Sequence, residues 1–389
     1  MPTPQEPFAR YVSRRRSRLA SLAWLRQSAT AASYRADELL VTDSGRDHVG
    51  RFFRDNPALP APQGSDEIMP GLHRYHVPGV DVLAAVRGIH RALPAGTRVA
   101  GPNHVFQGSP FNHGGPYGPP APTTAASLPG PADDGRLARV SIIDTGLWNQ
   151  TVLPSGYLNK DEIDYETATD VDNDGVLDGD VGHANFVAGV FAAHSPRAEL
   201  SVLKVLDTFG VCTEDQLVAA IARIDPATQV INLSLGGYTL DDAPPVGLSL
   251  ALAAALQGKD RVVVAAAGND GNGTNPFWPA AFAGAGLPWS SQVVAVAAHD
   301  GQQLCPWSNT GPWVTLAAAG ADIQSTFINH ALFPDGWAQW SGTSFATPRA
   351  GAAIAGLVDE QTGPVAALAS VLATVAAGGA RFGGYAALT

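Results

Sequence analysis

The chain has 389 residues, a formal net charge of −11, 45% hydrophobic residues and two cysteines. This length suffices for two or three domains with a sizeable core. The acidic balance argues against nucleic acid as the main partner, because phosphate binding needs a basic surface. No apolar run reaches the roughly 18–20 residues that span a bilayer, so no transmembrane segment is predicted. Cys212 and Cys305 cannot form a disulfide scaffold, and their spacing fits no metal site.

The N-terminus is basic. Residues 14–18 read RRRSR, residues 19–25 read LASLAWL, and Arg26 follows. A secretory signal also joins a basic region to an apolar core, but this core is short, contains a serine and is closed by an arginine. Residues 1–35 are therefore predicted to form a basic N-terminal arm, and a cytoplasmic location is favoured over secretion.

Residues 36–107 show short strand and helix patterns that predict a small α+β domain. With one more strand the order becomes β-α-β-β-α-β, which is that of a ferredoxin-like domain. A Pro/Gly-rich link separates the first helix from the second recognised strand. An unrelated α+β binding module is the alternative. The recognised strands are 38–41, 72–77 and 97–107, and the helices are 47–53 and 80–93.

Residues 108–135 are rich in glycine and proline and are predicted to be an exposed linker, where a protease would cut itself. From residue 136 to 389, short apolar runs alternate with helical stretches. Such runs suit a parallel sheet that is covered on both faces, so the pattern predicts a doubly wound α/β domain. The predicted strands are 137–143, 200–205, 229–235, 261–267 and 292–297, and the predicted helices are 183–193, 213–223 and 247–256.

Three polar residues stand at the ends of these elements. Asp144 follows an apolar strand, His183 begins a helix of small residues, and Ser344 precedes another such helix. A serine hydroxyl becomes a nucleophile when a histidine takes its proton, and a carboxylate can orient that histidine. The helix start adds the positive end of a dipole beside the serine. For Ser344 or Asp144 alone, a helix cap or a turn carboxylate is the simpler explanation.

A fourth motif, AAAGNDG at residues 265–271, places Asn269 after a buried strand. With Asp144, His183 and Ser344 it gives four motifs in register, and the chain resembles the subtilisin-like serine protease family, the subtilases. The resemblance covers residues 136–389. It implies a serine endopeptidase on a subtilisin-like fold, with Asn269 donating to the oxyanion. It also implies that residues 36–107 are a pro-domain, an intramolecular inhibitor removed by self-cleavage.

The same resemblance implies which residues bind polypeptide substrates. Ser234, Leu235, Gly236 and Gly237 match the family's substrate-binding strand, where adjacent glycines let a peptide backbone come close. Ala267 and Gly268 would help to wall the main specificity pocket. Since these residues carry no charge, an apolar or uncharged side chain before the cut is favoured. The chain departs from the family pattern after its catalytic histidine, where Ala184 and Asn185 replace glycine and threonine.

An acidic loop runs from Asp170 to Asp180. Aspartates at positions 1, 3 and 5 and a glycine at position 6 match the front of a calcium loop, but position 12 is Val181 rather than glutamate. A calcium site and a solvated acidic loop both stay open. The triad chemistry requires no cofactor and no metal.

Two other function classes remain as alternatives. An aspartic protease needs two Asp-Thr/Ser-Gly motifs in equivalent lobes, and Asp43 begins a second such motif in the small N-terminal domain. A non-catalytic binding module could also use a protease fold, since fold alone does not give function. Of the remaining histidines beyond residue 130, His299 and His330 are predicted to lie at the surface.

Overall fold

The computed structural model describes residues 25–27, 32–108, 116–132, 138–171, 173, 175 and 177–389. Most of the predicted basic arm, and Asp172 and Asp174 of the acidic loop, lie outside the described residues. Within the described ranges, no helix combines the length and the apolar character needed to cross a membrane.

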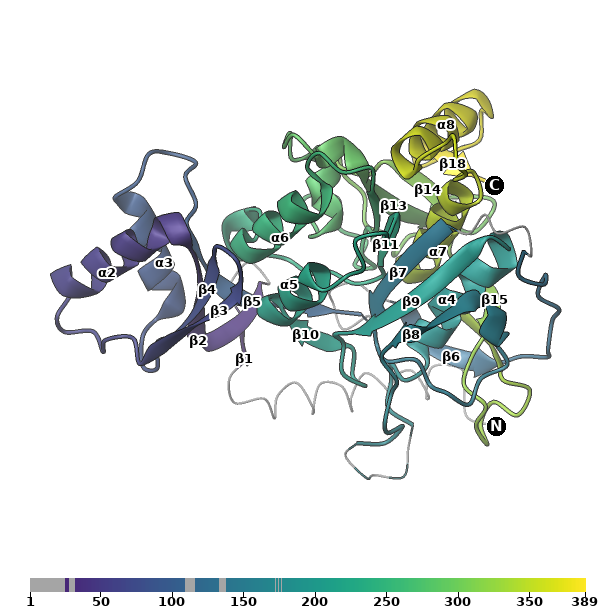
Figure 1. Cartoon of the computed structure of the whole chain (residues 1–389), viewed down its shortest axis with the longest axis horizontal. Helices are drawn as coiled ribbons and strands as arrows, with labels where there is room; N and C mark the ends of the chain where they lie inside the picture. Colours follow the sequence, from purple (N-terminus) through teal and green to yellow (C-terminus); the bar gives the residue numbers. More distant parts are fainter. Residues whose placement is uncertain are drawn as a thin grey trace.

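The N-terminal domain is a ferredoxin-like sandwich (Figure 1). An antiparallel sheet of order β5-β2-β4-β3 has α2 and α3 on one face, and β1 pairs with β2. The strand β3 is the one that sequence reasoning did not recognise, because its residues are polar and mostly exposed. The elements are β1 Leu25–Gln27, β2 Ser33–Thr42, α2 Arg46–Asp55, β3 Gly64–Met69, β4 Leu72–His76, α3 Val82–Arg91 and β5 Ala100–Gln107.

The larger domain is built on a nine-stranded sheet of order β17-β18-β14-β13-β12-β11-β7-β9-β8. All neighbours are parallel except the hairpin of β17 and β18. The strands are β7 Ala138–Asp144, β8 Leu158–Ile163, β9 Ala198–Lys204, β11 Val230–Leu233, β12 Val262–Ala266, β13 Val293–His299, β14 Leu316–Ala319, β17 Arg381–Phe382 and β18 Tyr385–Leu388.

The order of these strands reverses at β7, which has β9 on one side and β11 on the other. In doubly wound sheets the carboxyl ends of the strands at such a switch point flank the ligand crevice. Asp144 is the last residue of β7, and Ser234 directly follows β11. The predicted fold class, a subtilisin-like α/β sheet preceded by a small α+β domain, is confirmed.

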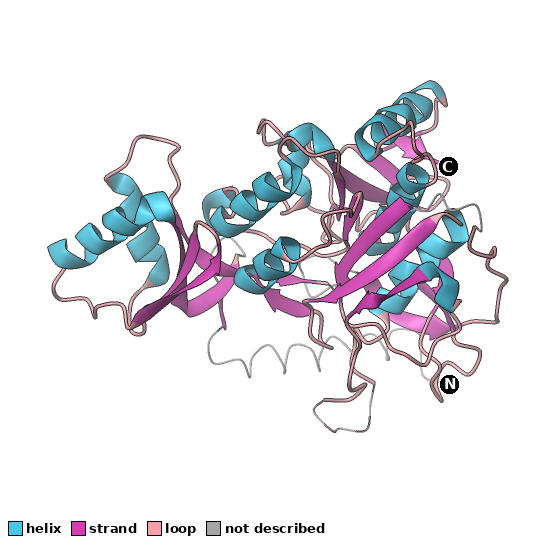
Figure 2. Ribbon diagram, in the orientation of Figure 1, coloured by secondary structure: helices cyan, strands magenta, loops and turns pink. Residues whose placement is uncertain are grey.

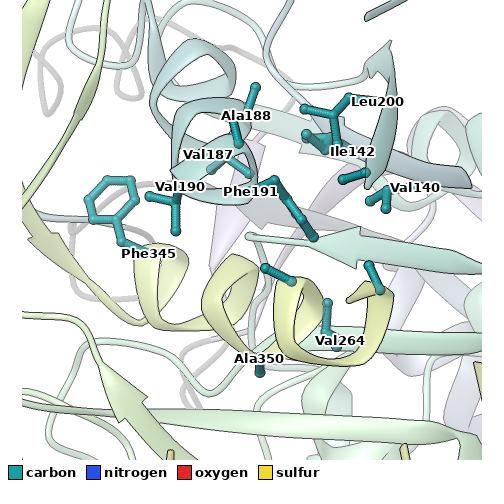
Figure 3. Close-up of a cluster of buried hydrophobic side chains, with 14 of the residues drawn as sticks. Val140, Ile142, Val187, Ala188, Val190, Phe191, Leu200, Val264, Phe345 and Ala350 are labelled. Carbon is teal, nitrogen blue, oxygen red and sulfur yellow. The ribbon is translucent and has the colours of Figure 1, made fainter. Parts of the chain in front are cut away.

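Helices cover both faces of the large sheet (Figure 2). The helices α4 and α7 pack on one face, joined by α8, and α5 and α6 pack on the other. Figure 3 shows how closely α4 and α7 approach, with Phe345 beside Val187 and Val190. A Cβ built on Gly351 of α7 would lie 2.6 Å from Phe191, so this approach requires glycine. The helices are α4 His183–His194, α5 Glu214–Ala222, α6 Val246–Leu256, α7 Thr343–Ala355 and α8 Pro364–Ala377.

A small antiparallel sheet leads into α7. It consists of β15 Ile323–Thr326, β16 Trp337–Gly342 and β6 Pro116–Pro122, with β16 in the centre. The strand β6 lies within the residues predicted as linker. Tyr117 pairs with Ser341, and the Trp340 indole N–H donates to the Gly118 carbonyl at 2.6 Å. Prolines are tolerated here because β6 is an edge strand.

The prediction that His299 lies at the surface is wrong. It ends the central strand β13 and is only 2% exposed. Its Nε2 donates to the Leu388 carbonyl, its Nδ1 accepts from the Gly301 N–H, and its ring stacks on Phe382 at 4.2 Å. Burial lowers the pKa of His299 below its ordinary value.

Candidate active site

Asp144 and His183 meet at the carboxyl edge of the large sheet. The Asp144 Oδ1 atom accepts from His183 Nδ1 at 2.6 Å and from the Thr145 N–H at 2.7 Å, and neither Asp144 nor His183 is exposed. His183 is the first residue of α4, preceded by Gly182 at φ +83°. The carboxylate therefore fixes the ring so that its other nitrogen, Nε2, carries the reactive lone pair.

Ser344 is the second residue of α7 and is fully buried. Its hydroxyl donates to the Ser234 carbonyl at 3.1 Å, and the Ser234 hydroxyl donates to the Ser344 carbonyl at 2.8 Å. This exchange ties the start of α7 to the end of β11. The next residue, Phe345, lies against the His183 ring at 5.4 Å between centroids, so the serine and the histidine occupy neighbouring positions.

Asn269 is held beside the start of α7. Its Oδ1 accepts from both the Thr343 N–H (2.9 Å) and the Thr343 hydroxyl (2.8 Å). This fixes the amide plane, and within the described part of the chain the Nδ2 atom is buried without a hydrogen-bond partner. A buried amide N–H₂ without a partner is costly, which marks a donor kept for a group that arrives later.

The backbone before Asn269 needs glycine. Gly268 has φ +102°, and a Cβ built on it would lie 2.2 Å from the Asn309 amide nitrogen. Asn309 in turn accepts from the N–H groups of Asp270 and Asn272. The buried Asn309 side chain therefore holds the loop that carries Asn269, because it contacts the residues before and after Asn269.

The C-terminal end of the N-terminal domain lies in a cleft of the larger domain. Gln107 and Gly236 exchange backbone hydrogen bonds of 2.9 and 3.1 Å. On its other side β5 pairs with β10, which comprises Val211–Thr213, and the Gly108 N–H donates to the Gly210 carbonyl at 2.8 Å. The tail, residues 105–108, is therefore the middle strand of a three-stranded arrangement.

The residues predicted to bind substrate have different places in this cleft. Gly236 pairs with the tail, while Gly237 pairs with Trp278 and has the Phe106 ring beside it. Leu235 and Ala267 are buried in the core between the sheet and its outer helices, so they offer backbone rather than side chain. Ser234, as described above, holds Ser344.

A polar network joins the two domains behind the tail. Asn103 is fully buried and donates to Glu38 at 2.6 Å and to Asp215 at 2.8 Å, and Arg74 also binds Asp215 at 2.5 Å. Next to it, His104 Nδ1 lies 2.6 Å from the Glu214 carboxylate. The sheet of the N-terminal domain thus rests on α5 and α6 with its buried polar groups paired.

A cavity of about 630 Å³ lies beside β10 and is lined partly by Arg35, Lys204 and Cys212. The cavity is separate from the triad, because Asp144, His183 and Ser344 are not among the residues that line it. Burial raises the pKa of the Cys212 thiol well above its ordinary value, so this cysteine stays protonated and unreactive.

The described part of the acidic loop is held by protein hydrogen bonds. Asp170 accepts from the Gly175 N–H at 2.9 Å. Asp178 accepts from the Val171 N–H and from the Thr208 hydroxyl, at 3.0 and 2.7 Å. Because Asp172 and Asp174 lie outside the described residues, the calcium site of this loop stays a prediction, and no step of the chemistry is assigned to a metal.

The aspartic-protease alternative fails on geometry. Asp43 lies in a short 3-10 turn of the N-terminal domain and contacts His73 at 2.7 Å, whereas Asp144 contacts His183 in the larger domain. Two carboxylates that share a proton must lie side by side. These two belong to separate sites.

Sequence reasoning missed three contributors to the site. Thr343 positions Asn269, and Gly210 with β10 forms the second wall of the cleft. Asn185, noted only as a departure from the family pattern, exchanges hydrogen bonds of 2.9 Å with the backbone of Trp148, which follows the Asp144 loop. The turn at Gly210 was a local signal for β10, but Thr343 and Asn185 act over long sequence distances that no local pattern reveals.

A comparison with protein-family models matches residues 135–379, more than half of the chain, to the subtilase family. The chain belongs to the subtilase family. It is 34% identical to thermitase of Thermoactinomyces vulgaris over 59% of this chain and 77% of that protein. It is 32% identical to the minor extracellular protease Epr of Bacillus subtilis over 57% of this chain, but it spans only 32% of that relative's length.

Among solved structures, fervidolysin from Fervidobacterium pennivorans, a keratinolytic enzyme related to subtilisin, aligns with 87% of this subtilase and with 58% of its own chain. The TM-score is 0.56 at 18% sequence identity, which supports the shared fold. The alignment covers more of the chain than the family-matched region, so it includes residues outside 135–379.

Proposed function

We propose that this subtilase is a serine endopeptidase that cuts polypeptides through Asp144, His183 and Ser344. The observation that carries the proposal is the convergence of three groups at one edge of the sheet. They are the buried Asp144–His183 hydrogen bond, Ser344 at the start of α7, and the open amide of Asn269. Family membership, which rests on independent comparison, supports the same activity.

The chemistry follows from these positions. The Ser344 hydroxyl exchanges its bond to the Ser234 carbonyl for one to His183 Nε2, which takes the proton as the oxygen attacks the scissile carbonyl. Asp144 stabilises the resulting imidazolium. The Asn269 amide and the Ser344 N–H receive the negative charge on the oxyanion. His183 then protonates the leaving amine, and water releases the acyl group by the reverse sequence.

The N-terminal domain is proposed to inhibit the enzyme that carries it. Its tail occupies the cleft in the manner of an added strand, so it competes directly with substrate. The buried network of Asn103, Asp215 and Arg74 supplies polar contacts behind the tail. Self-cleavage beyond Gly108 would turn this segment into a bound product.

Substrate recognition is proposed to rest on backbone pairing. Gly236 and Gly210 offer carbonyl and N–H groups to an extended peptide, whatever its side chains. This favours unfolded polypeptides as substrates. Subtilase catalysis needs no cofactor, and nothing in this sequence of steps requires one.

The deciding experiment compares the intact mass of the purified wild-type chain with that of Ser344→Ala. A wild type that has lost its N-terminal domain, beside a full-length mutant, supports both the nucleophile and self-processing. If both samples stay full length, a casein digestion assay separates a permanently attached domain from a non-catalytic binding module. Equal casein digestion by both samples would refute Ser344 as the nucleophile.

A further inference from the structure

The strand β6 lies beside the proposed nucleophile. It pairs with β16, and at one end of this pairing Pro116 lies opposite Gly342, two residues before Ser344. The other edge of β16 is paired with β15. Without β6, one edge of β16 would therefore be an open strand edge that leads directly to Ser344.

One aromatic side chain links β6 to the catalytic histidine. The Trp340 indole N–H donates to the Gly118 carbonyl of β6 at 2.6 Å. The Trp340 ring is only 2% exposed and meets the His183 ring edge to face, at 5.7 Å between centroids. Trp340 therefore connects β6 with the ring that would take the proton of the serine.

A second aromatic contact links β6 to the loop of the oxyanion donor. The Tyr117 ring of β6 stacks on Trp307 at 5.4 Å between centroids, with 9° between the ring planes. The Trp307 carbonyl accepts from the Gly271 N–H at 2.8 Å, two residues after Asn269. Together the two contacts place β6 across the site, from the side of the histidine to the side of the oxyanion loop.

The leaving part of a substrate consists of the residues after the cut. In the proposed reaction the tail takes the place of the residues before the cut, and only seven residues separate Gly108 from β6 in the sequence. An extended peptide gains binding energy by adding a strand to an open sheet edge. The edge of β16 beside Ser344 could bind the leaving part in this way, and β6 fills it.

We propose that β6 is a second inhibitory strand, which occupies the leaving side of the cleft and stays there after the N-terminal domain has been released. This inference rests on the proposed function and adds a substrate preference to it. While β6 is in place, the processed chain acts best on substrates with a short leaving part. Longer polypeptides must first displace β6 from β16.

Two features make this inhibition partial and permanent. Four of the seven residues of β6 are prolines, which have no N–H to donate, so the strand makes fewer hydrogen bonds and a substrate can displace it. A cut between Gly108 and β6 leaves the strand joined to β7. Its local concentration is then unaffected by dilution, in contrast to that of the released N-terminal domain.

The test uses two substrates with the same acyl part, which reads Asn-His-Val-Phe-Gln-Gly. In one it is joined to p-nitroaniline, and in the other to six small residues. The enzyme is the self-processed chain with the recognition sequence of a site-specific viral protease inserted between Thr124 and Ala125, which are exposed and outside regular structure. Cutting there detaches β6, and gel filtration removes it. Enzyme without the insertion, treated in the same way, is the control.

Detaching β6 should raise kcat/KM for the longer substrate by about tenfold or more and change that for the anilide by less than about twofold. A free peptide of residues 116–122 should restore the lower value. Equal changes for both substrates, or no change, overturn the proposal. Anilide hydrolysis that depends on Ser344 leaves the proposed function intact in that case, and its absence would refute the proposed function itself.

A second variant tests the same strand without cutting it. Tyr117→Ala removes the stacking on Trp307, and the fold should tolerate it because the Tyr117 side chain is 45% exposed. It should raise kcat/KM for the longer substrate about threefold to tenfold relative to the anilide. Tyr165→Ala is the matched control, since Tyr165 is also 45% exposed, and it should leave this ratio unchanged. The same ratio in both variants contradicts the proposal.

Discussion

Gln107 and Gly236 exchange two backbone hydrogen bonds, of 2.9 and 3.1 Å, across the boundary between the N-terminal domain and the protease domain. On its other side the tail pairs with β10, where Cys212 lies opposite Phe106. The Gln107–Gly236 pair therefore holds the tail in the cleft that is proposed to bind substrate.

Replacing Gln107 with proline should open the cleft. Proline removes the N–H that binds the Gly236 carbonyl, and it is poorly accepted in the middle strand of a sheet. In a Ser344→Ala background, which prevents self-cleavage, amide hydrogen exchange at Gly236 should become about tenfold faster or more. Gln107→Ala keeps the N–H and is the control. Unchanged protection of Gly236 in the proline variant would contradict the pairing.

Replacing Asn269 with alanine should lower kcat by ~10²–10³ with little change in KM, since its amide acts on the transition state. The same residue anchors Thr343 through its Oδ1, so some loss of stability is also expected. Asn269→Asp separates the two roles, because it keeps the acceptor and loses the donor. If the aspartate variant retains wild-type kcat, the oxyanion role of Asn269 is wrong.

Replacing Gly268 with alanine should destabilise the chain by several kcal/mol, because the added Cβ meets both an unfavourable φ and the Asn309 amide at 2.2 Å. Gly286→Ala is the matched control, since Gly286 has φ +69° and open space around its Cβ position. It should cost only about 1–2 kcal/mol. Urea unfolding in the Ser344→Ala background measures both. Equal losses of stability in the two variants would show that the Asn309 side chain moves away from the added Cβ at little cost.

His299 should make the fold sensitive to mild acid. Burial, reinforced by Arg349, lowers the pKa of His299 in the folded chain below its unfolded value near 6.5. The folded state then binds fewer protons than the unfolded state below that pH. Stability is therefore fully present above pH ~6.5 and is lost as the pH falls toward the folded pKa.

The measurement is urea unfolding at pH 7.5 and 5.5, again in the Ser344→Ala background. His299→Gln removes the titrating group, so the variant should lose less stability between these two pH values than the parent does. An identical loss in both chains would assign the acid sensitivity to other groups.

The five strands predicted in the large domain correspond to β7, β9, β11, β12 and β13 because a central parallel strand is a continuous apolar run. The edge strands β8 and β6 escaped this pattern. The strand β8 reads LNKDEI and is half-exposed, and β6 reads PYGPPAP, in which four of the seven residues are proline. Their pairing partners, not their own residues, make them strands.

The candidate site likewise contains residues that the local sequence predicts and contacts that it does not predict. Asp144, His183, Ser344 and Asn269 each end or begin a regular element, so local sequence marked all four as candidates. No local sequence pattern predicts the contacts that position these four residues. The bond from Asn269 to Thr343 and the bonds between Ser234 and Ser344 join segments that only the folded sheet brings together. His299 was misplaced for the same reason, since the C-terminal strand β18 covers it.

The strand β5 is shared by two sheets, pairing with β2 in its own domain and with β10 in the protease domain. While the chain is continuous, the tail is at an effective local concentration that dilution cannot change. If the chain is cut as proposed, the same contacts define a complex of two separate molecules, whose occupancy falls as the solution is diluted. The appearance of activity in a processing sample should therefore depend on total protein concentration, with dilute samples becoming active first.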